Sequence, residues 1–172
     1  MEVRHIDGPN DVRGILSVNS RAWRKAYNGL LPDDVLEAQP VEPTTEDVRQ
    51  QQGPLEENRE GILVAVDEGR VRGFVDLRWG DTGTKEFVDD GEADLRAIYV
   101  DPEYWGQGIG TTLLERGLDL LPSSVVRVRL EVFTENEPAR RFYEAKGFER
   151  TATGEYEIAG RTYPTTIYTV DL

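Results

Sequence analysis

Hydrophobic and polar residues alternate with two different periods along this chain, and the period distinguishes helices from strands. In residues 12–26, apolar side chains recur near every third or fourth position, which places them on one face of a helix. From residue 62 onward, several segments alternate apolar and polar residues, which is typical of strands with one buried face. The predicted helices cover about residues 10–27, 33–38, 45–52, 110–121 and 136–146, and the predicted strands cover about residues 2–6, 62–66, 71–78, 94–100, 125–133, 149–158 and 162–170.

Turn and cap residues indicate where these elements begin and end. Asn10 or Asp11 is suited to cap the first helix, and Gly53-Pro54 is expected to end the third. Asn136 is suited to cap the last helix, whose end is marked by Gly147. The resulting order is a strand, two or three helices, three strands, a helix, a strand, a helix and two strands. This order predicts a mixed α/β sheet in a single domain of residues 1–172.

Composition narrows the classes of protein that this chain can be. Its 33 acidic and 20 basic residues give a formal net charge of −13, which repels nucleic acids and anionic membranes and favours cationic partners. With no cysteine and a single histidine, His5, we expect no metal site. No signal-peptide pattern or long apolar run occurs, so we expect a cytoplasmic protein. An acidic chain with only three lysines also resembles proteins of halophilic organisms, although solubility alone could explain the charge.

A glycine-rich turn lies between a predicted strand and a predicted helix. Gly106, Gly108 and Gly110 follow the strand that ends near Val100, and the next helix begins at about Gly110. Glycines let a phosphate approach the backbone, and the first N–H groups of a helix have no partner within it, so this turn is a candidate anion site. The spacing fits neither a Walker loop nor a dinucleotide fingerprint. The alternative to an anion site is a tight turn in which the glycines are needed only for the backbone conformation.

Two segments then carry a resemblance to a known family. Residues 95–114, LRAIYVDPEYWGQGIGTTLL, are similar to the cofactor-binding motif of the GNAT superfamily of N-acetyltransferases. Residues 136–148, NEPARRFYEAKGF, resemble the family's N-x-x-A-x-x-F-Y-x-x-x-G-F stretch. The order of elements around both motifs also matches. The resemblance implies a central, mostly antiparallel sheet with helices on both faces.

The resemblance further implies where acetyl-CoA binds. The cofactor would lie between strands 94–100 and 125–133, which splay apart, with its pantetheine arm paired to the backbone of Ile98 and Val100. Asn136 would contact the arm further on. Trp105 departs from the family, which usually has Arg or Gln there, so that only its backbone can serve the phosphates. The expected pyrophosphate-binding residues are Trp105, Gly106, Gln107, Gly108, Gly110 and Thr111.

Acyl transfer to an amine also needs a proton donor for the leaving thiolate and a proton acceptor. Tyr143 matches the family's usual general acid, and an unperturbed phenol is protonated at neutral pH. Asp94 stands where some family members carry a glutamate base, although a solvated carboxylate at a strand start explains it equally well. Glu92 and Glu131 are weaker candidates.

Trp23 and Tyr27 lie one helical turn apart and share a helix face. Packing in the core is the plain interpretation of the pair, and the lining of an acceptor pocket is the alternative. The predicted function is transfer of an acetyl group from acetyl-CoA to a primary amine by direct attack. A non-catalytic acyl-CoA sensor is the alternative. The acceptor, a small molecule or a peptide, is not specified, and self-association into a homodimer stays open.

Overall fold

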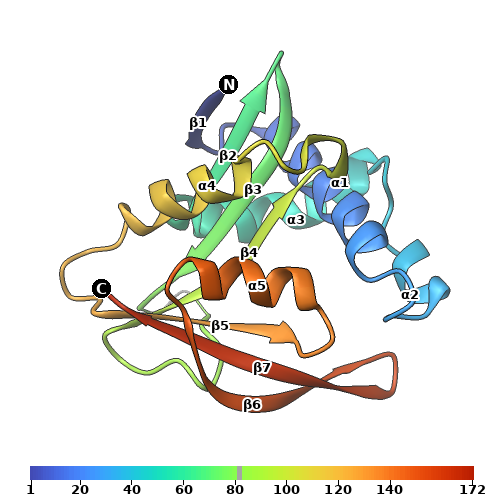
Figure 1. The fold of residues 1–172 in the computed structure, drawn as a ribbon. Coiled ribbons are helices and arrows are strands. Elements are labelled where there is room, and N and C mark those ends of the chain that lie inside the picture. Colours follow the sequence, from blue (N-terminus) through green and yellow to red (C-terminus); the bar gives the residue numbers. More distant parts are fainter. Residues whose placement is uncertain (81–82) are drawn as a thin grey trace.

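The computed structural model describes residues 1–80 and 83–172, and its elements follow the order predicted from the sequence (Figure 1). The helices are α1 (Pro9–Ala26), α2 (Asp33–Glu37), α3 (Thr45–Glu57), α4 (Ile109–Leu118) and α5 (Glu137–Ala145), with short 3₁₀ turns η1 (Arg59–Gly61) and η2 (Pro102–Tyr104). The strands are β1 (Glu2–His5), β2 (Ile62–Asp67), β3 (Arg70–Arg78), β4 (Glu92–Val100), β5 (Arg127–Phe133), β6 (Glu149–Ile158) and β7 (Arg161–Asp171).

The strands form one mixed sheet in the order β1-β2-β3-β4-β5-β7-β6. Every neighbouring pair is antiparallel except β4 and β5, which are parallel. Figure 1 shows α4 and α5 over one face of the sheet, with α1 and α3 behind the other. The predicted fold class, a mostly antiparallel mixed sheet between helices, is therefore confirmed.

Alternating side chains of the strands build two separate core clusters. Leu63 and Val75 pack with Leu113 of α4 on one face, while Ile62 and Phe74 pack with helix α1 on the other. This division follows from the two-residue period of a strand, which sends neighbouring side chains to opposite faces. Both faces of the central strands are buried, so the sheet holds the site residues in fixed positions.

The structure corrects several predicted boundaries. Helix α1 begins after Gly8 rather than at a side-chain cap, because the carboxylate of Asp11 is already bonded to Arg4 and to the N–H of Asp7. Helix α3 continues through Pro54 to Glu57, and Leu55 in this extra turn packs on the core cluster of α1. The strand predicted over residues 125–133 begins later than expected, because β5 starts at Arg127 and Val126 before it is exposed.

Two further features complete the description of the fold. Asn136 caps α5 as predicted, since its side chain accepts a hydrogen bond from the N–H of Ala139 at 3.3 Å. Among the helices in the described ranges, none is long and apolar enough to cross a lipid bilayer.

Gly61 marks a close approach between η1 and the backbone of β3. A Cβ atom at this position would lie 1.9 Å from the carbonyl oxygen of Leu77, which is main-chain and cannot move aside cheaply. Gly61→Ala should therefore lower the free energy of unfolding by about 1–3 kcal/mol or more. Gly53→Ala is the control, because Gly53 lies exposed within α3 with open space around it and should gain up to about 1 kcal/mol. Urea denaturation measures both, and equal stabilities would contradict the close approach.

Candidate active site

Strands β4 and β5 separate after a short stretch of pairing. Their register contains only the pairs Glu92–Arg127, Ala93–Val128 and Asp94–Arg129. Beyond Asp94 the two strands diverge, as the ribbon of β4 and β5 shows (Figure 1). A gap therefore opens in the middle of the sheet, alongside the second half of β4.

The backbone groups of Ile98 and Val100 are directed into this gap. The N–H of Asp101 donates to the carbonyl of Arg72 at 2.8 Å, so these two residues form a hydrogen-bonded pair between β3 and β4. Hydrogen-bonded and non-hydrogen-bonded pairs alternate along an antiparallel ladder. Val100 and Ile98 therefore belong to non-hydrogen-bonded pairs, and their N–H and C=O groups turn away from β3. The indole Nε1–H of Trp105 donates to the carbonyl of Val100 at 2.8 Å.

The glycine-rich turn leads directly into helix α4. Gly106 and Gly108 have φ angles of 81° and 82°, which glycine adopts without strain. Gly108 is the N-cap of α4, and none of the described side chains caps the helix. The first helical bond runs from Thr112 N–H to Gly108 C=O. The N–H groups of residues 109–111 therefore have no partner within the helix. A Cβ atom at Gly106 or Gly108 would enter open space, as a phosphate cradle requires.

Two cavities meet at the gap between β4 and β5. The first, which we call the glycine-turn groove, has a volume of about 490 Å³ and runs from the turn to α5. The second, the aromatic cavity, has a volume of about 360 Å³ and lies beside α1 and β5. The side chains that line both are Ile98, Tyr99, Asn136, Ala139 and Tyr143. The aromatic residues of the second cavity are Trp23, Tyr27, Phe74, Tyr99, Phe133, Tyr143 and Tyr156.

Tyr143 stands at this junction, on helix α5. Its side chain is 8% exposed, and its ring packs edge-to-face against Phe142 and Phe148, at centroid distances of 5.2 and 5.5 Å. Burial, with a smaller contribution from Tyr99, raises the pKa of Tyr143 well above its usual range. No hydrogen bond from residues 1–80 or 83–172 occupies its hydroxyl. The hydroxyl therefore stays protonated at physiological pH and remains available to a ligand.

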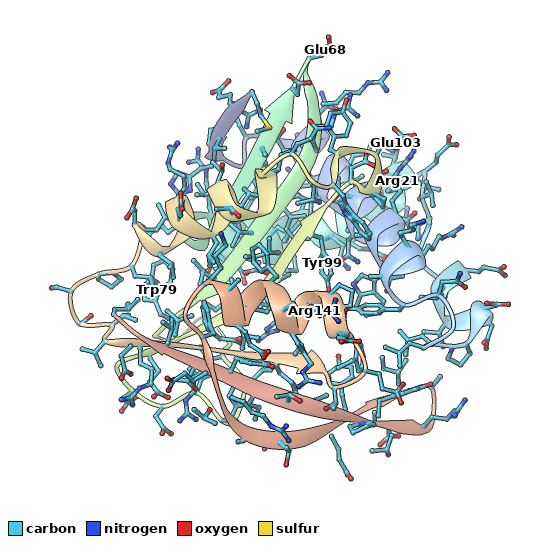
Figure 2. The ribbon with its side chains drawn as sticks, viewed as in Figure 1. Arg21, Glu68, Trp79, Tyr99, Glu103 and Arg141 are labelled. Carbon is cyan, nitrogen blue, oxygen red and sulfur yellow. The ribbon has the colours of Figure 1, made fainter. Side chains whose placement is uncertain are left out.

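Trp23 and Tyr27 line the aromatic cavity and also pack together. Their rings meet edge-to-face at 5.2 Å, and the Tyr27 hydroxyl lies 3.1 Å from that of Tyr99. Figure 2 shows Tyr99 between α1 and α5. Trp23 and Tyr27 thus pack against each other and also line the cavity, and their contact with an acceptor stays a prediction. Tyr99 was not predicted as a site residue, because only the pairing register shows which way its side chain points.

The three candidate carboxylates occupy different environments. Asp94 is 1% exposed, is held by Arg96 Nε at 3.1 Å and by the N–H of Lys85 at 3.3 Å, and lines neither cavity. Asp94 as the base therefore stays a prediction, and its carboxylate is paired with Arg96 and is not among the residues that line the two cavities. Glu92 is also enclosed. Although burial acts to raise the pKa of Glu92, hydrogen bonds from Asp89 N–H and Arg127 lower it overall.

Glu131 is the one of the three that faces the aromatic cavity. Its two carboxylate oxygens accept hydrogen bonds from Lys85 Nζ at 2.8 Å and from Thr165 Oγ1 at 2.6 Å. The sequence offered a signal for this position, since Glu131 stands on the alternate face of a strand whose other face is apolar. The site thus joins a glycine-rich turn at the start of a helix, a buried phenol and a carboxylate around one opening.

Comparisons with known proteins agree with this architecture. Residues 21–148 match the acetyltransferase (GNAT) family, and the chain belongs to that family. An uncharacterized N-acetyltransferase, YuaI of Bacillus subtilis (strain 168), is 30% identical over 87% of this chain and 82% of that protein. A mycothiol acetyltransferase of Thermobifida fusca (strain YX) is 37% identical over 62% of this chain, which spans only 34% of that longer protein.

A solved structure of similar fold contains the cofactor. PaiA N-acetyltransferase from Thermoplasma acidophilum, in complex with coenzyme A, superposes with a TM-score of 0.69 at 21% identity, over 99% of this chain and 98% of that one. The present chain is accordingly an acyltransferase of a family whose acyl donor is acetyl-CoA.

Proposed function

We propose that the protein transfers an acetyl group from acetyl-CoA to a primary amine by direct attack, with both substrates bound together. The observation that carries this proposal is that the glycine-turn groove and the aromatic cavity share lining residues, Tyr143 among them. One cavity offers backbone donors for an anionic cofactor, and the other offers aromatic walls and a carboxylate for a cationic acceptor. The net charge of −13 attracts such an acceptor.

The residues of the groove fit the cofactor. The N–H groups of residues 109–111 would hold the pyrophosphate, aided by the positive end of α4. Each hydrogen bond to a charged group contributes about 1.5–3 kcal/mol, so a few of them outweigh the protein's distant, screened negative charge. The backbone of Ile98 and the N–H of Val100 would pair with the pantetheine arm, while Trp105 already occupies the Val100 carbonyl. Asn136, which caps α5 and lines the groove, would contact the arm.

Acetyl-CoA supplies the acetyl group as an activated thioester. The N–H of Ile98 would donate to the thioester oxygen and stabilise the charge that develops there, which leaves the carbonyl of Ile98 for the pantetheine arm. Glu131 would accept the proton of the attacking amine, directly or through a water molecule. Tyr143, held in its protonated form by burial, would donate its proton to the sulfur of the leaving thiolate. Trp23 and Tyr27 would form the wall against which the acceptor lies.

The direct test is the release of coenzyme A thiol from acetyl-CoA when a panel of primary amines is added. We expect release only with an amine present, together with one equivalent of the N-acetylated amine detected by mass spectrometry. A protein that binds coenzyme A in calorimetry but releases no thiol with any amine would instead be the non-catalytic sensor.

Glu131→Gln should lower turnover by about 10²–10⁴ at neutral pH, because the amide cannot accept the proton. The difference in turnover between Glu131→Gln and the wild type should become smaller as the pH rises, since more of the amine is then already neutral when it binds. Steady-state kinetics between pH 7 and about pH 10, near the pKa of an alkylamine, would show both effects. Glu155→Gln, an exposed carboxylate on β6 outside both cavities, is the matched control for the lost charge. Equal turnover by the two variants would exclude Glu131 as the base.

A further inference from the structure

Lys85 brings an ammonium group into the aromatic cavity. Its Nζ lies 2.8 Å from Glu131 Oε1 and 5.3 Å from the centroid of the Tyr156 ring, the geometry of an ion pair with a cation–π contact. The side chains of Lys85 and Glu131 are only 27% and 10% exposed. The backbone N–H of Lys85 is bonded to the buried carboxylate of Asp94, which fixes where this side chain starts.

The partners of Glu131 divide between its two oxygens. Oε2 accepts from the hydroxyl of Thr165, on the neighbouring strand β7, at 2.6 Å. Oε1 accepts from Lys85 Nζ, which comes from the segment between β3 and β4. Thr165 is nearly fully buried and belongs to the sheet, whereas Lys85 carries a flexible four-carbon stem. Of the two partners, only the ammonium group can withdraw without disturbing the sheet.

We propose that Glu131, Thr165 and Tyr156 form an ammonium subsite that Lys85 fills in the free enzyme and yields to the acceptor. This inference rests on the proposed function, and it specifies the acceptor as a primary amine at the end of an unbranched alkyl chain. Such a group reproduces the Lys85 side chain, whose Nζ already satisfies Glu131 and the ring of Tyr156.

The exchange is favourable on electrostatic grounds. A largely buried carboxylate left without a cation is costly, but replacing one ammonium by another keeps Glu131 paired throughout. An α-amino acid is disfavoured, because its own carboxylate would lie close to that of Glu131. The acceptor's amine would bind at Glu131 Oε1, so the same carboxylate oxygen would recognise the ammonium group and accept its proton.

Lys85 then acts as a tethered competitor, and its removal should strengthen amine binding. The apparent affinity for the amine equals the intrinsic affinity multiplied by the fraction of molecules in which the subsite is free. For an ion pair of this exposure, we expect Lys85→Met to tighten binding by about three- to tenfold. Lys85→Arg keeps a cation of similar reach and should bind no more tightly than the wild type.

The experiment uses n-butylammonium, the analogue of the lysine side chain, as the probe in calorimetry without acetyl-CoA. Lys85→Met should bind it more tightly than the wild type, and Glu131→Gln in the same background should remove the binding. n-Butanol, which lacks the charge, should bind to neither. Lys25→Met, at an exposed lysine of α1, is the control for lost positive charge and should match the wild type.

Three results would overturn the subsite: equal or weaker binding by Lys85→Met, binding that survives Glu131→Gln, or glycine binding more tightly than n-butylammonium. Because the readout is binding without acetyl-CoA, it is independent of catalysis. Amine-dependent thiol release with no effect of Lys85 would reject this inference and keep the proposed function. Tight butylammonium binding with no thiol release from any amine would keep the ammonium subsite and reject the proposed function.

Discussion

Gly108→Val should weaken coenzyme A binding by about a hundredfold or more, measured by calorimetry on the folded variant. The valine side chain would extend into the open space before α4, where the pyrophosphate must approach the N–H groups of residues 109–111. Loss of two hydrogen bonds to charged oxygens, at about 1.5–3 kcal/mol each, is sufficient for this effect. At a φ of 82°, valine also strains the backbone, at a cost of about 1–2 kcal/mol in stability.

Two control variants separate the lost cradle from the strain. Gly160→Val, in the β6–β7 turn with a φ of 79° and open surroundings, imposes similar strain away from both cavities. It should lose stability but keep its affinity for coenzyme A. Gly110→Ala adds a Cβ at ordinary contact distance from Phe142, without a positive φ, and should change affinity little. Undiminished affinity in Gly108→Val would reject the turn as the phosphate site.

Local signals predicted those parts of the fold that depend on neighbouring residues. The cap at Asn136 and the element order rest on side chains close in sequence, and the structure confirms both. The end of α3 was wrong for a tertiary reason. Gly53-Pro54 is a strong local breaker, but burial of Leu55 against the α1 cluster favours one more turn.

The residues of the candidate site also fall into two groups: those that local sequence indicates and those whose role depends on tertiary contacts. The turn and Tyr143 are predicted from the sequence because their residues are adjacent or belong to a motif. The choice among Asp94, Glu92 and Glu131 depends on sheet register and, for Glu92 and Glu131, on cations from other segments, which no periodicity reports. Asp94 is enclosed by Arg96, whereas Glu131 faces the cavity from a different strand. Lys85 was missed because it reaches the site from a segment without regular structure.

Tyr143→Phe should lower turnover by about 10²–10⁴ while changing coenzyme A affinity little. The substitution keeps the ring contacts with Phe142 and Phe148 and removes only a hydroxyl with no hydrogen bond to the described residues. A parallel fall in kcat and kcat/KM would mark an interaction made mainly in the transition state. Tyr163→Phe is the matched control and should keep normal turnover, because Tyr163 is another buried tyrosine, lines neither cavity and has no hydrogen-bond partner for its hydroxyl among the described residues.

The pH dependence distinguishes proton donation by Tyr143 from a packing role. Burial raises the pKa of Tyr143, so the hydroxyl remains protonated, and the wild type should lose no activity through its ionisation up to about pH 10, the usual pKa of tyrosine. The thiol of coenzyme A resembles that of cysteine, with a pKa of about 8.5, so at higher pH the thiolate can leave without a proton. The deficit of Tyr143→Phe should therefore shrink as the pH rises from 7 to about 9, whereas a packing defect would be the same at both. If Tyr143→Phe retains more than about half of the wild-type kcat at pH 7, the loss is smaller than acid catalysis requires, and Tyr143 is not the proton donor.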